Sequence, residues 1–92
     1  MESIITDDME HCFECGSPYV QVHHCLHGVA NRKLADKYKL VVPLCVTHHT
    51  GAHGVHKNAL FDLRLKKIAQ KAFEREIGTR EEFMKIFGKN YL

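Results

Sequence analysis

Residues 40–56 of the sequence read LVVPLCVTHHTGAHGVH, an apolar run that leads directly into a segment rich in cysteine and histidine. The run at 40–44 is rich in β-branched residues, which favour a strand. Pro43 has no N–H to donate, so the strand ends there or lies at the edge of a sheet. Cys45 and His48 follow at once, separated by two residues. We therefore predict a strand over 40–44 that ends in a pair of metal ligands.

A second ligand pair, Cys12 and Cys15, has the same spacing and lies upstream in CFECGSPYVQVH, where alternation over 19–23 predicts another strand. A gap of two residues lets both side chains of a pair reach one ion, at about 2.3 Å for sulfur and about 2.0 Å for nitrogen. We predict a structural zinc site of Cys12, Cys15, Cys45 and His48 that joins the two ends of a β-hairpin. The competing interpretation is a set of buried, reduced cysteines with an incidental histidine.

The length and composition of the chain favour a small metal-stabilised protein. Its 92 residues, 45% of them hydrophobic, predict one domain over 1–92 with a thin core. Residues 1–11 are acidic and resemble no secretory signal, so we expect a loose leader and a cytoplasmic protein. Four cysteines in that reducing compartment favour metal binding over disulfides, and no apolar run is long enough for a membrane span. Cys25, outside both pairs, is expected to be a buried hydrophobe.

The remaining pattern predicts helices in the C-terminal third. Residues 28–39 look like a polar connection, with at most one helical turn around 33–37. Asn58 can cap a helix whose apolar face repeats every three or four residues, and Gly78 ends it. Thr79 and Glu82 form a capping box that begins a last short helix. The order of strand, strand and helix predicts a small α+β domain, with residues 58–92 as added C-terminal helices.

Histidine is the residue whose distribution most needs explanation. Seven of the eight histidines lie in two clusters, 23–27 and 48–56. His49 is four residues from His53 and seven from His56, and either spacing would put two imidazoles on one face of a helix. A set of histidine ligands leaves coordination positions of a metal open, unlike a closed cysteine site. The alternative is that these are surface histidines or ligands of a second structural zinc.

The two ligand pairs, Cys12/Cys15 and Cys45/His48, enclose HHCLHG at 23–28 and are followed by further histidines. This arrangement resembles the HNH endonuclease family. It is similar in particular to small phage-encoded HNH proteins and to phage recombination-enhancement nucleases. The resemblance covers residues 12–56, about half of the chain. It implies a ββα-metal core (the His-Me finger), a metal-dependent DNA endonuclease activity, and a phage or prophage protein in the bacterial cytoplasm.

The resemblance also implies residue roles. His23 and His49 would be ligands of a catalytic Mg²⁺, Mn²⁺, Ni²⁺ or Zn²⁺, and His24 would be the general base. The third ligand would be His56 or His53, with His56 favoured because Gly51 and Gly54 disfavour a regular helix across 53. The asparagine in the family's name has no counterpart near 38–40, where the chain reads Tyr-Lys-Leu.

Basic residues indicate a nucleic-acid partner. Arg32, Lys33, Lys37 and Lys39 lie close together in the sequence and are predicted to bind the DNA backbone. The row formed by Arg64, Lys67, Lys71 and Arg75 is more typical of the solvated face of a helix. A protein partner or a second copy of the chain is not indicated. The alternative functions are a non-catalytic zinc module that binds DNA or protein, and an RNA-cleaving nuclease.

Overall fold

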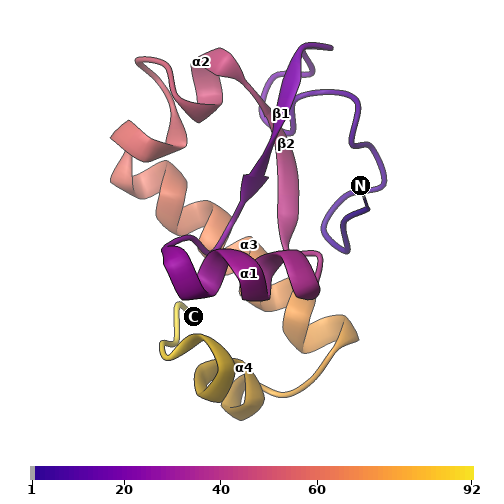
Figure 1. Ribbon diagram of the computed structural model, residues 1–92, viewed down its shortest axis with the longest axis vertical. Helices are drawn as coiled ribbons and strands as arrows, with labels where there is room; N and C mark the ends of the chain where they lie inside the picture. The colour runs from indigo at the N-terminus through magenta and orange to yellow at the C-terminus, as the bar shows by residue number, and fades with distance from the viewer. Residues whose placement is uncertain (1) are drawn as a thin grey trace.

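The computed structural model describes residues 2–92 and has an antiparallel hairpin at its centre (Figure 1). Strand β1 (Val20–His24) pairs with β2 (Val41–Cys45), so that Val20 lies opposite Cys45 and His24 opposite Val41. Both strands are shifted by one residue from the predicted positions. β1 therefore ends on His24, the predicted general base, and β2 ends on Cys45, a predicted zinc ligand.

Over residues 2–92, four α-helices and one short 3₁₀ helix complete the α+β fold. Helix α1 (Val29–Lys37) connects the two strands, and α2 (Val46–His49) directly follows β2. The 3₁₀ helix η1 (Val55–Lys57) leads into the long helix α3 (Ala59–Glu76), and α4 (Arg80–Phe87) is last. Figure 1 shows α2 at one end of the hairpin and α4 beyond the other. Within residues 2–92, no helix combines the length and the apolar character that crossing a membrane requires.

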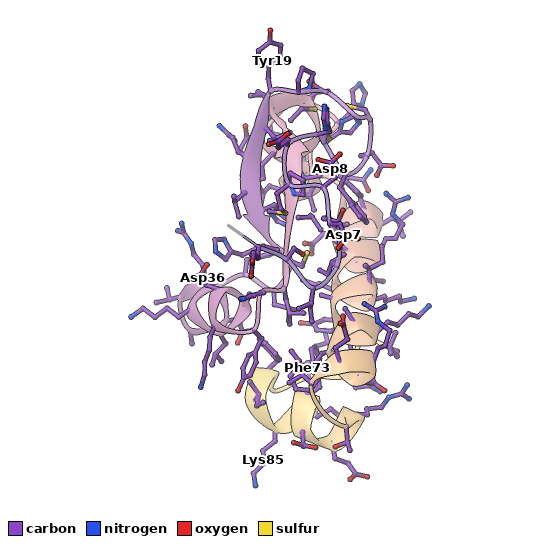
Figure 2. All side chains as sticks on the ribbon, turned by 90° about the vertical axis from the view of Figure 1, so that its right-hand side faces the viewer. Asp7, Asp8, Tyr19, Asp36, Phe73 and Lys85 are labelled. Carbon is purple, nitrogen blue, oxygen red and sulfur yellow. The ribbon has the colours of Figure 1, made fainter. Side chains whose placement is uncertain are left out.

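The core lies between β2 and α3. All five residues of β2 are buried, and Leu65 and Phe73 of α3 are among the largest fully buried side chains. Phe73 also packs edge-to-face against Phe83 of α4, and Figure 2 shows it between the two helices. The Asn58 side chain accepts hydrogen bonds from the N–H groups of residues 60 and 61 and caps α3, as predicted. The predicted capping box of α4 is present too.

Helix α1 is longer than the single turn expected around 33–37. Only Ala35 is fully buried in it, while Leu34 and Tyr38 pack at the edge of the core. Gly28, at the N-cap, provides no side-chain hydrogen bond. The apolar stripe is thus too short to be recognised in the sequence, because packing and not local signals stabilises this helix.

The N-terminal segment is attached to the hairpin, whereas a loose leader was expected over 1–11. The Ile4 N–H donates to the carbonyl of Lys39, and the Ser3 hydroxyl donates to the carbonyl of Val41. Ile4 and Ile5 pack against the core. Residue 1 lies outside the described residues. The segment therefore packs beside the start of β2, where this strand follows α1.

Candidate metal centres

Cys12, Cys15, Cys45 and His48 come together at the end of the hairpin, as the spacing predicted. One ligand atom from each lies within 4.8 Å of all the others. The Cys15 and Cys45 sulfurs are 3.7 Å apart. Two sulfurs that are each about 2.3 Å from a tetrahedral zinc would be about 3.8 Å apart, so the separation fits. We call these four residues the zinc knuckle, and they are positioned to bind a metal ion such as zinc.

The backbone prepares the knuckle for a cation. The Gly16 N–H donates to the Cys12 carbonyl at 2.8 Å, which closes the turn, and the Phe13 N–H donates to the Pro43 carbonyl and attaches that turn to β2. Burial alone would raise the pKa of the Cys12 thiol, but hydrogen bonds from the backbone at 45, 15 and 14 outweigh it and lower this pKa to about 6. Cys12 therefore favours the thiolate, which is the form that binds metal.

A second group, which we call the histidine cluster, consists of His23 on β1, His49 on α2 and His56 on η1. One nitrogen from each lies within 4.8 Å of the other two. The ring centres are 5.2 Å (23 to 49), 5.3 Å (23 to 56) and 5.1 Å (49 to 56) apart. An imidazole bound at about 2.1 Å has its centre about 3.2 Å from the ion, so tetrahedral neighbours would be about 5.2 Å apart. The three separations match this value.

The hydrogen bonding of the cluster also fits a metal. The Nε2 atom of His23 is buried and has no hydrogen-bond partner among residues 2–92. Burial, and then the neighbouring His49 and His56, lower the pKa of His23 to about 3, so its ring stays neutral as a ligand must be. His49 has its Nδ1 atom 2.8 Å from Oε1 of Gln21, which can accept the Nδ1 proton and leave Nε2 free to bind.

His24 lies beside this cluster, next to an open space. A cavity of about 410 Å³ is lined by both His24 and the whole cluster, and it also touches Val22, His27, Gly28, Val29 and Arg32. The His24 side chain is 15% exposed, and its Nε2 atom is 3.4 Å from Oδ1 of Asp36 on α1. In Figure 2, Asp36 lies on the side of α1 that faces the strands. An imidazole that can accept a proton thus faces the same cavity as three potential ligands.

His53 lies elsewhere, so of the two alternatives for the third ligand only His56 is beside His23 and His49. His53 lines a separate cavity together with Glu14 and Arg64. Helix α2 ends at His49, so 49 and 53 do not share a helix face. A turn follows, in which the Gly54 N–H donates to the Gly51 carbonyl at 2.9 Å. This turn brings His56 back toward the cluster.

The four basic residues predicted to bind DNA divide into two groups. Arg32 lines the cavity of the histidine cluster, and it shares a neighbouring cavity with Lys33, Val22 and His24. Lys37 lies over the ring of Tyr38, 5.3 Å from its centre. Lys39 forms an ion pair with Glu2 at 2.8 Å and lines a different cavity, formed by the N-terminal segment. Only Arg32 and Lys33 of the four line a cavity that His24 also lines.

No family model, curated protein or solved structure matches this chain.

Three acceptors that hold imidazoles were missed in the sequence: Gln21, Asp36 and Asp62. Each is an ordinary polar residue, and Asp36 and Asp62 come from helices that pack beside the hairpin. Gln21 bonds to His49, 28 positions away, and Asp62 bonds to His27, 35 positions away. Periodicity within one segment cannot report such pairs. The alternation at 19–23 places Gln21 and His23 on one face, and it was the single available signal.

Proposed function

We propose that this protein is a metal-dependent DNA endonuclease of the HNH type, built on a ββα-metal core. The observation that carries the proposal is the histidine cluster: three potential ligands from β1, α2 and η1 meet, and His24 faces the same cavity. A closed structural site would not need a further histidine at an open cavity. In this proposal β1, β2 and the segment from α2 to η1 form the catalytic core, and the zinc knuckle holds its strands together.

The chemistry requires a proton acceptor and a site for charge. A divalent ion on His23, His49 and His56 would neutralise charge on the scissile phosphate and on the leaving oxygen. Asp36 accepts the Nε2 proton of His24, so Nδ1 carries the lone pair that takes a proton from the attacking water. The water oxygen bonds to phosphorus, the bond to the leaving oxygen breaks, and that oxygen takes a proton from solvent.

The charge beside the cavity favours a polyanion as substrate. Arg32 and Lys33 are exposed on α1, next to His24. Each side chain that contacts a phosphate adds affinity that is independent of sequence and falls with salt. These contacts position the backbone, and base contacts would be needed to select a sequence. We therefore expect binding that weakens as the salt concentration rises.

The proposal is tested with supercoiled plasmid and protein carrying one equivalent of zinc, to which Mg²⁺, Mn²⁺, Ni²⁺ or further Zn²⁺ is added. Wild-type protein should convert the plasmid to nicked or linear forms. Loss of a general base typically costs about 10²–10⁴-fold in rate, so His24→Ala should be at least about 100-fold slower. His53→Ala is the matched control, because it removes an exposed histidine outside the cavity, and it should cleave like the wild type.

Each alternative has its own outcome. Tight DNA binding without cleavage in every metal would overturn the enzyme and favour a non-catalytic zinc module. Cleavage of RNA with none of DNA would assign the same site to a ribonuclease. If folded His24→Ala cleaved at the wild-type rate, His24 would not be the base.

A further inference from the structure

His27 belongs to the cavity of the histidine cluster, although the sequence suggested no metal role for it. It lies in the turn between β1 and α1 and lines the same cavity as the cluster. Its ring centre is 5.6 Å from that of His56 and 6.2 Å from that of His23. Its Nε2 atom is 2.9 Å from Oδ1 of Asp62 on α3. Asp62 of α3 therefore holds the imidazole of His27 at the edge of the histidine cluster.

Asp62 fixes which nitrogen of His27 is available. The Asp62 carboxylate forms an ion pair with Lys66, so it is ionised. Lys66 lies one turn further along α3, with its Nζ atom 2.7 Å from the carboxylate. An ionised carboxylate only accepts, so His27 donates its Nε2 proton to it. In the neutral ring, Nδ1 then carries the lone pair.

This is the hydrogen-bonding pattern of a metal-binding histidine. Such residues usually donate their other N–H to a carboxylate or carbonyl oxygen, which fixes the tautomer and makes the ligand more basic. His49 shows the same pattern with Gln21. We propose that His27, held by Asp62, is a fourth and exchangeable ligand of the metal at the histidine cluster. The inference rests on the metal site of the proposed function and does not depend on cleavage.

A small movement separates His27 from the other ligands. Its nitrogens lie outside the group whose ligand atoms are all within 4.8 Å. Its ring-centre separations of 5.6 and 6.2 Å exceed the tetrahedral value of about 5.2 Å by roughly 0.4 and 1.0 Å. The side chain is 40% exposed, which leaves it room to turn. A ligand that must move to bind is also one that a phosphate oxygen can replace.

Four imidazoles would select the class of metal. Imidazole suits zinc, nickel, copper and iron, whereas magnesium prefers carboxylate, carbonyl and water oxygens. Asp62 does not offset this preference, because its carboxylate is occupied by His27 and Lys66. The site is therefore assigned to a transition-metal ion such as Zn²⁺ or Ni²⁺, with Mg²⁺ bound far more weakly.

The test is a Co²⁺ titration without DNA. Protein is first given one equivalent of Zn²⁺. It fills the knuckle, because thiolates bind zinc more tightly than imidazoles alone, and Co²⁺ does not displace it, because zinc binds such a site more tightly than cobalt. Co²⁺ is then added to wild-type, His27→Ala, Asp62→Asn and His53→Ala proteins, and its dissociation constant and visible absorption are recorded. We expect both His27→Ala and Asp62→Asn to weaken binding about 10- to 100-fold. The visible absorption of bound cobalt should change in position or intensity in His27→Ala, because a water replaces an imidazole, and His53→Ala should match the wild type.

The outcomes separate this inference from the proposed function. Unchanged affinity and absorption in His27→Ala would overturn the inference and leave a three-histidine site intact. An unchanged affinity in Asp62→Asn alone would remove Asp62 from it. His49→Ala is the reference for the cluster itself: if it too binds Co²⁺ like the wild type, the metal site and the proposed function both fail. Circular dichroism of each zinc-loaded variant shows whether it is folded.

Discussion

At the scale of single residues, close backbone contact decides the geometry of the histidine cluster. A Cβ atom added to Gly54 would lie 2.5 Å from the carbonyl oxygen of His49 and 2.8 Å from its carbonyl carbon. Real Cβ atoms do not approach a carbonyl this closely, so one of the two backbone segments would have to move. Gly54 thus allows the turn that brings His56 to the cluster.

We therefore expect Gly54→Ala to weaken metal binding at the histidine cluster at least about tenfold, because ligands displaced by about 1 Å no longer share an ion. The measurement is the Co²⁺ titration of zinc-loaded protein. Gly88→Ala is the control, since Gly88 has φ +79° but no atom within 4 Å of the added Cβ. That change should cost roughly 1–2 kcal/mol of stability, because a side chain disfavours this left-handed backbone, and leave Co²⁺ affinity unchanged. Equal affinity in both variants would contradict the role of Gly54.

The residues of the site could be predicted from the sequence only where the signal was local. The two ligand pairs of the knuckle are separated by two residues each, and their meeting follows from the hairpin. The choice between His53 and His56 depended on the two nearby glycines, and His56 is the one that lies beside His23 and His49. The partners of the imidazoles come from distant segments, so no spacing could reveal them. Lys39 shows the converse: it is close to Lys37 in sequence, yet pairs with Glu2 at another cavity.

At the scale of elements, the predictable helices were those with their own start signals. Helix α3 has a side-chain cap and a long buried face, and α4 has a complete capping box. Both strands were found within one residue. Helix α1 lacks a capping side chain and buries only Ala35 fully, so its sequence resembles a polar loop. The contacts of residues 3–5 with the hairpin were missed because they, too, depend on distant partners.

The cap of α3 provides a test at this scale. Asn58→Ala removes the acceptor of two backbone N–H groups, each 3.1 Å from Oδ1. We expect it to lower the free energy of unfolding by about 1 kcal/mol, the usual value of an N-cap. Urea denaturation of zinc-loaded protein measures the change. Asn31→Ala, within α1, should be neutral or slightly stabilising because alanine has the higher helix propensity. An equal loss in both variants would mean that the cap contributes nothing.

At the scale of the whole molecule, a small core lies beside four residues that are positioned to bind a metal ion. A domain of this size buries only about 60–65% of its unfolded surface. The zinc knuckle brings together the turn at 12–16, the end of β2 and α2. Structural zinc contributes roughly 10–16 kcal/mol of apparent folding free energy in zinc-finger peptides. The fold should therefore depend on the metal.

Removal of zinc with a chelator at neutral pH should abolish cooperative unfolding, followed by circular dichroism during urea titration. Two cysteines sharpen the test, because Cys15 is exposed and Cys25 is buried. If burial alone mattered, Cys25→Ala would be the more harmful change. Since Cys15 is a knuckle residue, we expect Cys15→Ala to destabilise by several kcal/mol and Cys25→Ala by about 1 kcal/mol. The reverse order would show that the knuckle does not stabilise the fold.

Helix α2 carries His48 and His49, two consecutive residues that belong to different groups of ligands. Successive positions on an α-helix are turned by about 100°, and this turn directs one ring to the knuckle and the next to the histidine cluster. Adding or deleting one residue between Cys45 and His48 would rotate both rings together and misdirect both. The number of residues in this segment is consequently as constrained as their identity, and loop-length variation should be tolerated elsewhere first.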